Sequence, residues 1–228
     1  MDFSGIEKLS FVDWDNKIVT TLFTRGCNFR CPFCHNGFLV VGEDKNTIPF
    51  EEILNYLLSR KKFIDGVVIS GGEPTLMNDL PEKIKILKDN DFKIKLDTNG
   101  TNFEMLKYLI DNKLIDYVAM DIKNSFEKYP ETCGKYNLDL ENIKKSISYL
   151  KENHIDYEFR MTIVKEFHTM EDMDKIGEIV CGSPIFFLQH FKNSDGCIKQ
   201  GLHEIPLEEA NKFKEILEKY TKVKLRGY

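Results

Sequence analysis

Three cysteines, Cys27, Cys31 and Cys34, lie within one short stretch of the chain, and no fourth cysteine follows nearby. Three thiols on one loop would make a poor core and would be prone to oxidation, so this C-x3-C-x2-C spacing favours metal ligation over packing. A structural zinc site takes four ligands, and His35 is available as the fourth. An iron–sulfur cluster held by three cysteines keeps one iron free to bind another molecule. The spacing alone leaves both kinds of site open.

Polar and glycine-rich segments follow the next three strands that the sequence predicts. These segments are Ser70-Gly-Gly-Glu-Pro74, Asp97-Thr-Asn-Gly100 and Asp121-Ile-Lys123. In parallel α/β folds, ligands bind beyond the carboxyl ends of the strands. We therefore expect the three segments and the cysteine loop to converge on one face of the molecule.

With these residues in view, the chain resembles the radical S-adenosylmethionine (SAM) superfamily. Its signature, C-x3-C-x-aromatic-C, is matched by the three cysteines together with Phe33, and Gly71-Gly72-Glu73 follows the next strand. Arg25-Gly-Cys27, the continuation Cys34-His-Asn36 and the two aspartate motifs are similar to those of glycyl-radical-enzyme activating proteins. The most similar branch is the compact one that activates anaerobic ribonucleoside-triphosphate reductase.

The resemblance implies two cofactors, one 4Fe-4S cluster and SAM. Cys27, Cys31 and Cys34 would be the catalytic residues that bind the cluster, and the amino and carboxylate groups of SAM would chelate the free iron. Reduction of the cluster would cleave the sulfonium of SAM into methionine and a 5′-deoxyadenosyl radical. The ligand missing from the protein would thus come with the cofactor.

The resemblance also implies residues that bind SAM. The two glycines allow close approach of the backbone to the methionyl group, and Glu73 would accept from its ammonium. In pyruvate formate-lyase activating proteins, aspartates that match Asp97 and Asp121 help to bind a monovalent cation. Phe33 would contact adenine, and Lys123 and Arg160 would pair with the carboxylate. The residues expected to bind SAM or this cation are Phe33, Gly71, Gly72, Glu73, Asp97, Asp121, Lys123, Arg160 and His190.

The partners follow from the same resemblance. The radical would abstract hydrogen from a backbone glycine of a partner enzyme, and flavodoxin or ferredoxin would supply the electron. Some activating proteins carry extra cysteine clusters after the first motif, whereas residues 36–70 contain no cysteine here. A single cluster is therefore expected, in an activator of the ribonucleotide reductase or pyruvate formate-lyase type.

Two rival functions remain open. One is a radical SAM enzyme that acts on a small molecule, such as a 7-carboxy-7-deazaguanine synthase. The other is a non-catalytic metal-binding or electron-transfer module, which would have four protein ligands and would not bind SAM.

The elements that position these residues alternate along the chain. Strands are predicted at Ile18–Phe23, Gly66–Ser70, Lys93–Asp97, Tyr117–Asp121, Tyr157–Ile163 and Ile185–Gln189. Helices are predicted at Phe50–Lys61, Asp79–Asn90, Phe103–Asn112, Leu140–Asn153 and Met170–Val180, with a last one at Pro206–Tyr220. An additional strand is expected in Gly5–Val12.

This order predicts an α/β fold with a parallel sheet. A closed eight-unit barrel needs about 250 residues, so six units favour a partial, open (β/α)6 TIM-like barrel of the radical SAM type. A doubly wound sheet is the alternative. We expect one domain over residues 1–228, with an extension at 1–16, the barrel core at 17–190 and a C-terminal segment at 191–228.

Composition excludes several other classes of protein. The net charge of −5 argues against a general nucleic-acid binder, and the apolar runs are too short to cross a membrane. A cytoplasmic, reducing location is expected, since the six cysteines do not form a dense disulfide framework. The scattered Cys133, Cys181 and Cys197 are expected to be small buried side chains.

Overall fold

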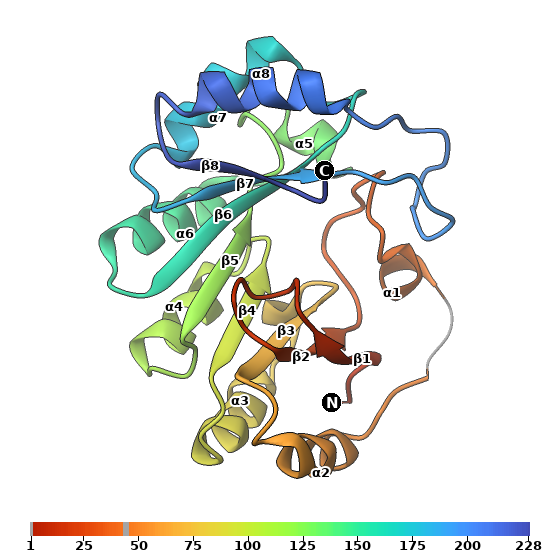
Figure 1. The fold of residues 1–228 in the computed structure, drawn as a ribbon, viewed down its shortest axis with the longest axis vertical. Coiled ribbons are helices and arrows are strands. Elements are labelled where there is room, and N and C mark those ends of the chain that lie inside the picture. Colours follow the sequence, from red (N-terminus) through yellow and green to blue (C-terminus); the bar gives the residue numbers. More distant parts are fainter. Residues whose placement is uncertain (1, 43–45) are drawn as a thin grey trace.

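A single eight-stranded sheet organises the chain, and its strands follow the order of the sequence from β1 to β8 (Figure 1). The computed structural model describes residues 2–42 and 46–228. The strands are β1 (Gly5–Ser10), β2 (Val19–Thr24), β3 (Gly66–Gly71), β4 (Ile94–Thr98), β5 (Tyr117–Asp121), β6 (Asp156–Ile163), β7 (Phe186–His190) and β8 (Val223–Arg226). β1 pairs antiparallel with β2, and every later neighbouring pair is parallel.

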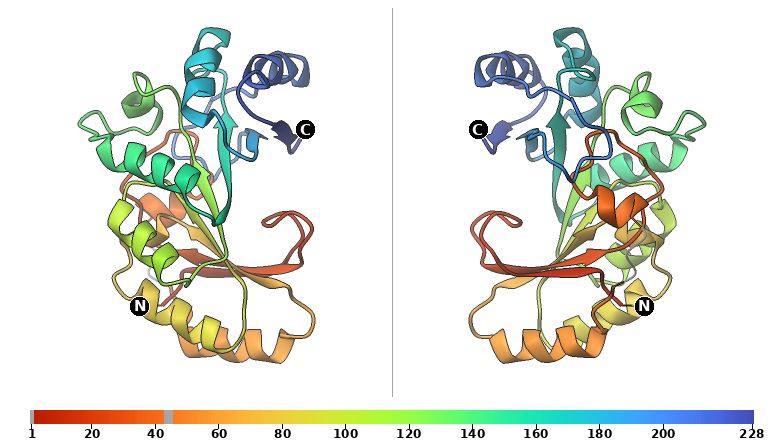
Figure 2. Two further views of the ribbon diagram at one scale, coloured as in Figure 1. Left: turned by 90° about the vertical axis from the view of Figure 1, so that its left-hand side faces the viewer. Right: turned by 90° about the vertical axis from the view of Figure 1, so that its right-hand side faces the viewer.

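Helices connect the parallel strands, and the longer ones cover the outer face of the curved sheet (Figure 2). They are α1 (Gly37–Val41), α2 (Phe50–Arg60), α3 (Leu80–Asp89), α4 (Phe103–Asp111), α5 (Tyr129–Thr132), α6 (Glu141–Glu152), α7 (Met170–Val180) and α8 (Leu207–Leu217), with a 3₁₀ turn at Pro74–Leu76. Among the described residues, none of these helices has the length and apolar character needed to cross a bilayer.

The strand order confirms a partial, open barrel and contradicts the doubly wound alternative. A doubly wound sheet reverses its strand order at a switch point, whereas this sheet runs in sequence order and curls. Among the described residues, β1 and β8 do not pair, so the barrel stays open between them. The six predicted core strands are β2 to β7, and the expected additional strand is β1. The parallel strand β8 was not predicted.

The alternation of side chains along the strands separates the core from the site. On β3, Val67 and Ile69 belong to the main apolar core, to which the helices also contribute, whereas Val68 packs on the other face against Trp14. Trp14 belongs to the β1–β2 connection, and its ring lies 5.6 Å from that of Tyr117 on β5. This connection therefore fills part of the barrel interior and leaves the carboxyl ends of the strands for the polar side chains.

Candidate active site

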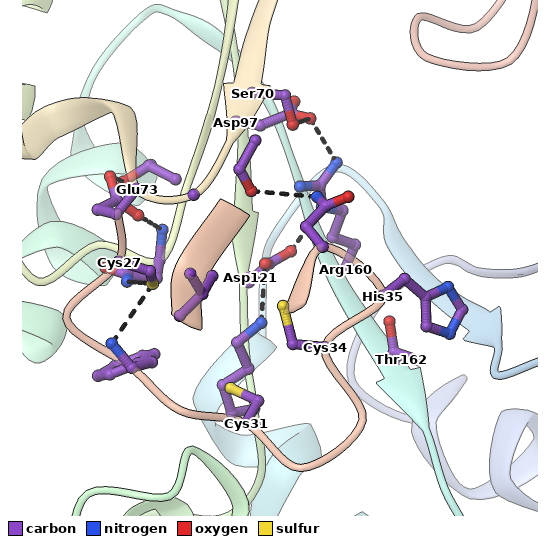
Figure 3. Close-up of a pocket in the computed structure, with 18 of the residues that line it drawn as sticks. Cys27, Cys31, Cys34, His35, Ser70, Glu73, Asp97, Asp121, Arg160 and Thr162 are labelled. Atoms are coloured by element: carbon purple, nitrogen blue, oxygen red, sulfur yellow. Dashed lines mark hydrogen bonds and ion pairs between the residues drawn. The ribbon is translucent and has the colours of Figure 1, made fainter. Parts of the chain in front are cut away.

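A cavity of about 390 Å³ lies at the carboxyl ends of the strands (Figure 3). All the site residues expected from the sequence line it, with the exception of His190. Its walls also include Asp13, Phe23, Phe29, His35, Asn36, Val40, Ser70, Thr98, Asn99, Thr162 and Gln189. The predicted convergence of the cysteine loop with the three strand-end segments is therefore what the structure shows.

The cysteine loop between β2 and α1 is held by bonds from its own backbone and from distant segments. The Cys34 N–H donates to the Cys31 carbonyl (3.0 Å), which forms a tight turn between the last two thiols. The Arg30 N–H donates to the Cys133 carbonyl at the end of α5 (2.9 Å). The Lys199 N–H donates to the Pro32 carbonyl (2.8 Å). Segments far apart in the sequence thus fix the loop on which the three thiols stand.

Burial sets the acidity of the three thiols. It raises the pKa of Cys27 to about 11 and that of Cys31 to about 12, and it also raises the pKa of Cys34. A thiolate here would therefore be unstable without a nearby positive charge, and iron ions would supply that charge. The donor set fits a cluster that demands thiolates, because the loop offers three cysteines to the same cavity.

The geometry does not favour a structural zinc site formed by this loop and His35. Within residues 2–42 and 46–228, no three His, Cys, Asp or Glu side chains come close enough together to hold one metal ion. The His35 ring packs against Phe191 instead, with 5.4 Å between the ring centroids. In a 4Fe-4S cluster each cysteine binds a different iron, so its thiols need not converge on one point.

The two glycines of Gly71-Gly72-Glu73 allow the β3 loop to lie against the segment that enters the cysteine loop. Gly71 has φ +107°, and a Cβ on Gly72 would lie 1.9 Å from the carbonyl oxygen of Gly26. The Glu73 N–H donates to that same carbonyl (2.8 Å). We predicted that these glycines let the backbone come close to the cofactor. In the structure they also let the β3 loop pack closely against Gly26, the residue before Cys27.

Glu73 is engaged by the protein more fully than the sequence suggested. Its side chain is 1% exposed, and Oε1 accepts from the Thr75 N–H (3.1 Å), the Thr75 hydroxyl (2.6 Å) and the Thr98 hydroxyl (2.8 Å). Oε2 accepts from the Asn99 N–H (2.7 Å). Burial raises the pKa of Glu73, although these bonds oppose that shift. The carboxylate joins the loops after β3 and β4, and its contact with a cofactor ammonium stays a prediction.

Two aspartates and two cations form the charged wall of the cavity (Figure 3). Arg160 on β6 bridges them, with Nη1 3.0 Å from Asp97 Oδ2 and Nε 2.5 Å from Asp121 Oδ1. Lys123 Nζ lies 2.9 Å from Asp121 Oδ2, and the Ser70 hydroxyl donates to Asp97 Oδ2 (2.9 Å). Burial alone would raise the pKa of Asp121, but the charges of Arg160 and Lys123 hold it well below its usual range.

The structure does not bring His190 into this group. Successive side chains of a strand point to opposite faces, and on β7 it is Gln189 that lines the cavity. His190 packs instead on the ring of Tyr228, with 4.3 Å between the centroids, and its Nε2 lies 3.2 Å from Glu204 Oε2. The expected contact with the cofactor is thus not supported by its position.

Sequence reasoning missed His168, which connects Phe33 to Lys123. His168 is 1% exposed, and its Nδ1 accepts from the Val164 N–H (3.0 Å), so Nε2 donates to the Lys123 carbonyl (2.9 Å). Phe33 packs against the rings of Phe167 (5.7 Å) and His168 (6.4 Å). Burial lowers the pKa of His168, which keeps it neutral. Its place just after β6, on the ligand-binding end of the sheet, is the signal that could have pointed to it.

Comparison with known proteins agrees with this geometry. The sequence pattern described as the radical SAM superfamily matches residues 21–179. A protein of Methanocaldococcus jannaschii named "Putative glycyl-radical enzyme activating enzyme MJ1227" is 37% identical over 217 residues, which are 93% of this chain and 89% of that protein. A pyruvate formate-lyase-activating enzyme of Staphylococcus aureus is 30% identical over 77% of this chain and 74% of its own length.

Among solved structures, Streptococcus suis SuiB bound to S-adenosylmethionine superimposes with a TM-score of 0.70 at 19% identity. The match covers 89% of this chain and 48% of SuiB, so this chain spans about half of that protein. At this identity the likeness shows the fold alone. The matched sequence pattern and the two relatives establish the family: the chain belongs to the radical SAM superfamily, whose enzymes use a 4Fe-4S cluster and SAM.

Proposed function

We propose that this enzyme abstracts a hydrogen atom from a backbone glycine of a partner enzyme and leaves a glycyl radical there. The names of its relatives support an activating function for the chain. The observation that carries the proposal is the cavity itself, where three cysteines meet the loops after β3, β4 and β5. A cavity of about 390 Å³ falls within the range of small-molecule sites, as a bound nucleoside cofactor requires.

Each group of residues would have one task at this site. Cys27, Cys31 and Cys34 would hold the cluster, which supplies the electron that cleaves SAM. Arg160 and Lys123 are the cations of the wall and would bind the cofactor carboxylate. In this structure the Arg160 guanidinium lies between Asp97 and Asp121. A monovalent cation bound by these two aspartates would take its place, so the guanidinium would have to move toward the cofactor.

Phe33, which also lines the cavity, would meet the adenine. It belongs to the cysteine loop itself and is held by packing on Phe167 and by the neutral His168. Gly71 and Gly72 would bring backbone groups to the methionyl part, and Glu73 fixes the loop that does so. The chain's own residues thus bind and orient both cofactors, and the partner would bring its glycine through the open side of the barrel.

We further propose that the partner is anaerobic ribonucleoside-triphosphate reductase and that flavodoxin or ferredoxin is the reductant. The reaction needs a reducing compartment, which the cytoplasm provides. The test is to incubate the anaerobically reconstituted enzyme with SAM, reductant and either this reductase or pyruvate formate-lyase. Electron paramagnetic resonance should show the doublet of a glycyl radical on the reductase. A doublet on pyruvate formate-lyase alone would contradict the proposed partner, and a doublet on neither, with turnover of a small molecule, would favour the rival class.

A further inference from the structure

A second row of buried charges lies next to the cavity wall, and the proposed function does not use it. Lys95 stands two residues before Asp97 on β4, and Glu158 stands two residues before Arg160 on β6. Residues two apart on a strand share a face, so Lys95 and Glu158 lie on the interior face that carries the wall residues. Lys95 is 1% exposed and Glu158 is 2% exposed. Charged side chains are rarely this buried unless they are paired.

This row leads from the open edge of the barrel to its interior. Arg226 on the last strand, β8, lies 2.9 Å from Asp15 of the β1–β2 connection and 3.1 Å from Glu158 Oε1. The Lys95 ammonium lies 3.7 Å from the same Glu158 oxygen, and Tyr117 donates its hydroxyl proton to Glu158 Oε2 (3.1 Å). Charges of opposite sign therefore alternate from Asp15 to Lys95.

Lys95 connects this row to the cavity wall through Asp97. Its ammonium lies 3.5 Å from Asp97 Oδ1, a buried oxygen with no hydrogen bond among the described residues. The other oxygen, Oδ2, binds Arg160 (3.0 Å). The Lys95 ammonium donates a hydrogen bond to the backbone carbonyl of Asp13, which carries no net charge. The charge of Lys95 is therefore shared between Asp97 and Glu158, while Asp97 shares its charge between Lys95 and Arg160.

We infer that Lys95 and Glu158 are positioning residues that set how firmly Asp97 holds Arg160, and through it how strongly the cavity binds the carboxylate of SAM. The inference rests on the proposed role of Arg160 as a partner of that carboxylate. Lys95 competes with Arg160 for Asp97, and Glu158 competes with Asp97 for Lys95. Each of the two residues therefore acts on Arg160 with the opposite sign.

Substitution of Lys95 and substitution of Glu158 should change the affinity for SAM in opposite directions. Lys95→Met leaves Arg160 as the remaining cation paired with Asp97, so the guanidinium is held more tightly by the protein and the cavity loses one positive charge. SAM should bind more weakly, by about tenfold for one charge-assisted contact. Glu158→Gln releases Lys95 to Asp97, which frees Arg160 and removes a negative charge, so SAM should bind several-fold more tightly. Loss of folding in general would weaken binding in both variants.

The experiment is titration calorimetry of SAM into the anaerobically reconstituted wild-type protein and the two variants. Glu209→Gln is the control, because it removes a carboxylate from a more exposed ion pair with Lys165 (2.5 Å), and neither residue of that pair lines the cavity. The control should keep the wild-type dissociation constant. Circular dichroism and the iron content of each sample show whether the variants are folded and loaded.

Opposite shifts of the dissociation constant would support the inference. Shifts of the same sign, or no shift in either variant, would overturn the inference. If the wild-type protein still binds SAM, that result would not contradict the proposed function. If Lys95→Met does not fold, Glu158→Gln decides alone, and weaker or unchanged binding overturns the inference. A folded, fully loaded wild-type protein that binds no SAM would instead contradict the proposed function.

Discussion

At the scale of single residues, burial in the site disfavours the ionised forms of the three cysteines and of Asp121. The three thiols lie in a place where burial disfavours thiolates, and Asp121 stays ionised only because Arg160 and Lys123 surround it. Cys133 lies beside the same loop, and its carbonyl, not its thiol, holds Arg30. The Cys133 thiol donates to the Pro130 carbonyl (3.6 Å) and does not line the cavity, so we expect that it does not bind the cluster.

Replacing one cysteine of the loop should abolish cluster binding. Cys34→Ser removes one of three thiolate ligands, so we expect iron after anaerobic reconstitution to fall to a small fraction of the wild-type content. Cys133→Ser is the control and should retain the full content. Iron and sulfide analysis with the visible absorption spectrum would check this. Equal loss in both variants would mean that Cys133 binds iron too.

The glycine that touches the cysteine loop should not tolerate a methyl group. In Gly72→Ala the new Cβ would meet the Gly26 carbonyl, so backbone must shift and the free energy of unfolding should fall by about 1–3 kcal/mol. Gly5→Ala is the control, since its Cβ would lie 3.6 Å from Phe23, an ordinary contact. Urea unfolding would measure both. A Gly72→Ala protein as stable as wild type would show that the two loops do not touch as described.

Strand-end positions predicted that the cysteine loop and the polar segments would converge, and the family resemblance supplied the remaining candidate residues of this site. Asp97 and Asp121 could be assigned to one place because parallel strands bring their carboxyl ends together, whereas Arg160 was expected from the family resemblance. His190 could not be placed correctly, because a shift of one position along β7 changes the face, and Gln189 has the inward position. The bonds of Glu73 and His168 depend on loop conformations that no local sequence pattern specifies.

At the scale of elements, most helices begin and end close to the residues predicted from capping signals and apolar periodicity. α7 begins with a capping box. The Thr169 side chain accepts from the backbone N–H of Asp172, and the Asp172 side chain accepts from the backbone N–H of Thr169. Asp172 also pairs with Lys128 (2.8 Å), which joins α7 to the segment before α5. The long helices were predicted to within a few residues. α1 and α5 are too short for a periodic pattern to show, and β8 has only four residues.

The capping box should make part of the stability depend on pH. Burial alone would raise the pKa of Asp172, but its bonds to Lys128 and Thr169 hold it below the ordinary 3.8. A lowered folded pKa gives stability that is present above the unfolded pKa and is lost as the pH falls through the folded pKa. Asp172→Asn should thus cost about 1 kcal/mol at pH 7 and progressively less below about pH 4.

Unfolding by urea at several pH values would measure this dependence. Glu171→Gln, in the same turn but exposed, is the matched control and should change stability little at any pH. A constant difference between wild type and Asp172→Asn from pH 7 to pH 3 would show that the Asp172 charge does not contribute.

At the scale of the whole molecule, an incomplete barrel leaves two sheet edges, β1 and β8, on either side of an opening (Figure 2). Asp15 and Arg226 connect these two sides by an ion pair rather than by backbone hydrogen bonds. Under the proposed function, a protein substrate would approach the cavity from this open side. The central strands, by contrast, have a neighbour on both sides and helices over their outer face.

Hydrogen exchange should follow this arrangement. Amides of β4 and β5 should exchange slowest, and those of β1 and β8 should exchange earlier, because edge strands open without disturbing the core. Mass spectrometry of peptides after deuterium labelling would measure the order. Protection of β8 equal to that of β5 would indicate that another segment or a second molecule covers this edge.

The central claim is that the radical formed in this cavity takes its hydrogen from a glycine of a protein. The most direct measurement supplies a candidate partner enzyme whose glycines carry deuterium at the α-carbon and analyses the 5′-deoxyadenosine by mass spectrometry. We predict 5′-deoxyadenosine that has gained one deuterium, together with a glycyl radical on the partner. Formation of 5′-deoxyadenosine without deuterium, under conditions in which the partner carries the radical, would contradict the account.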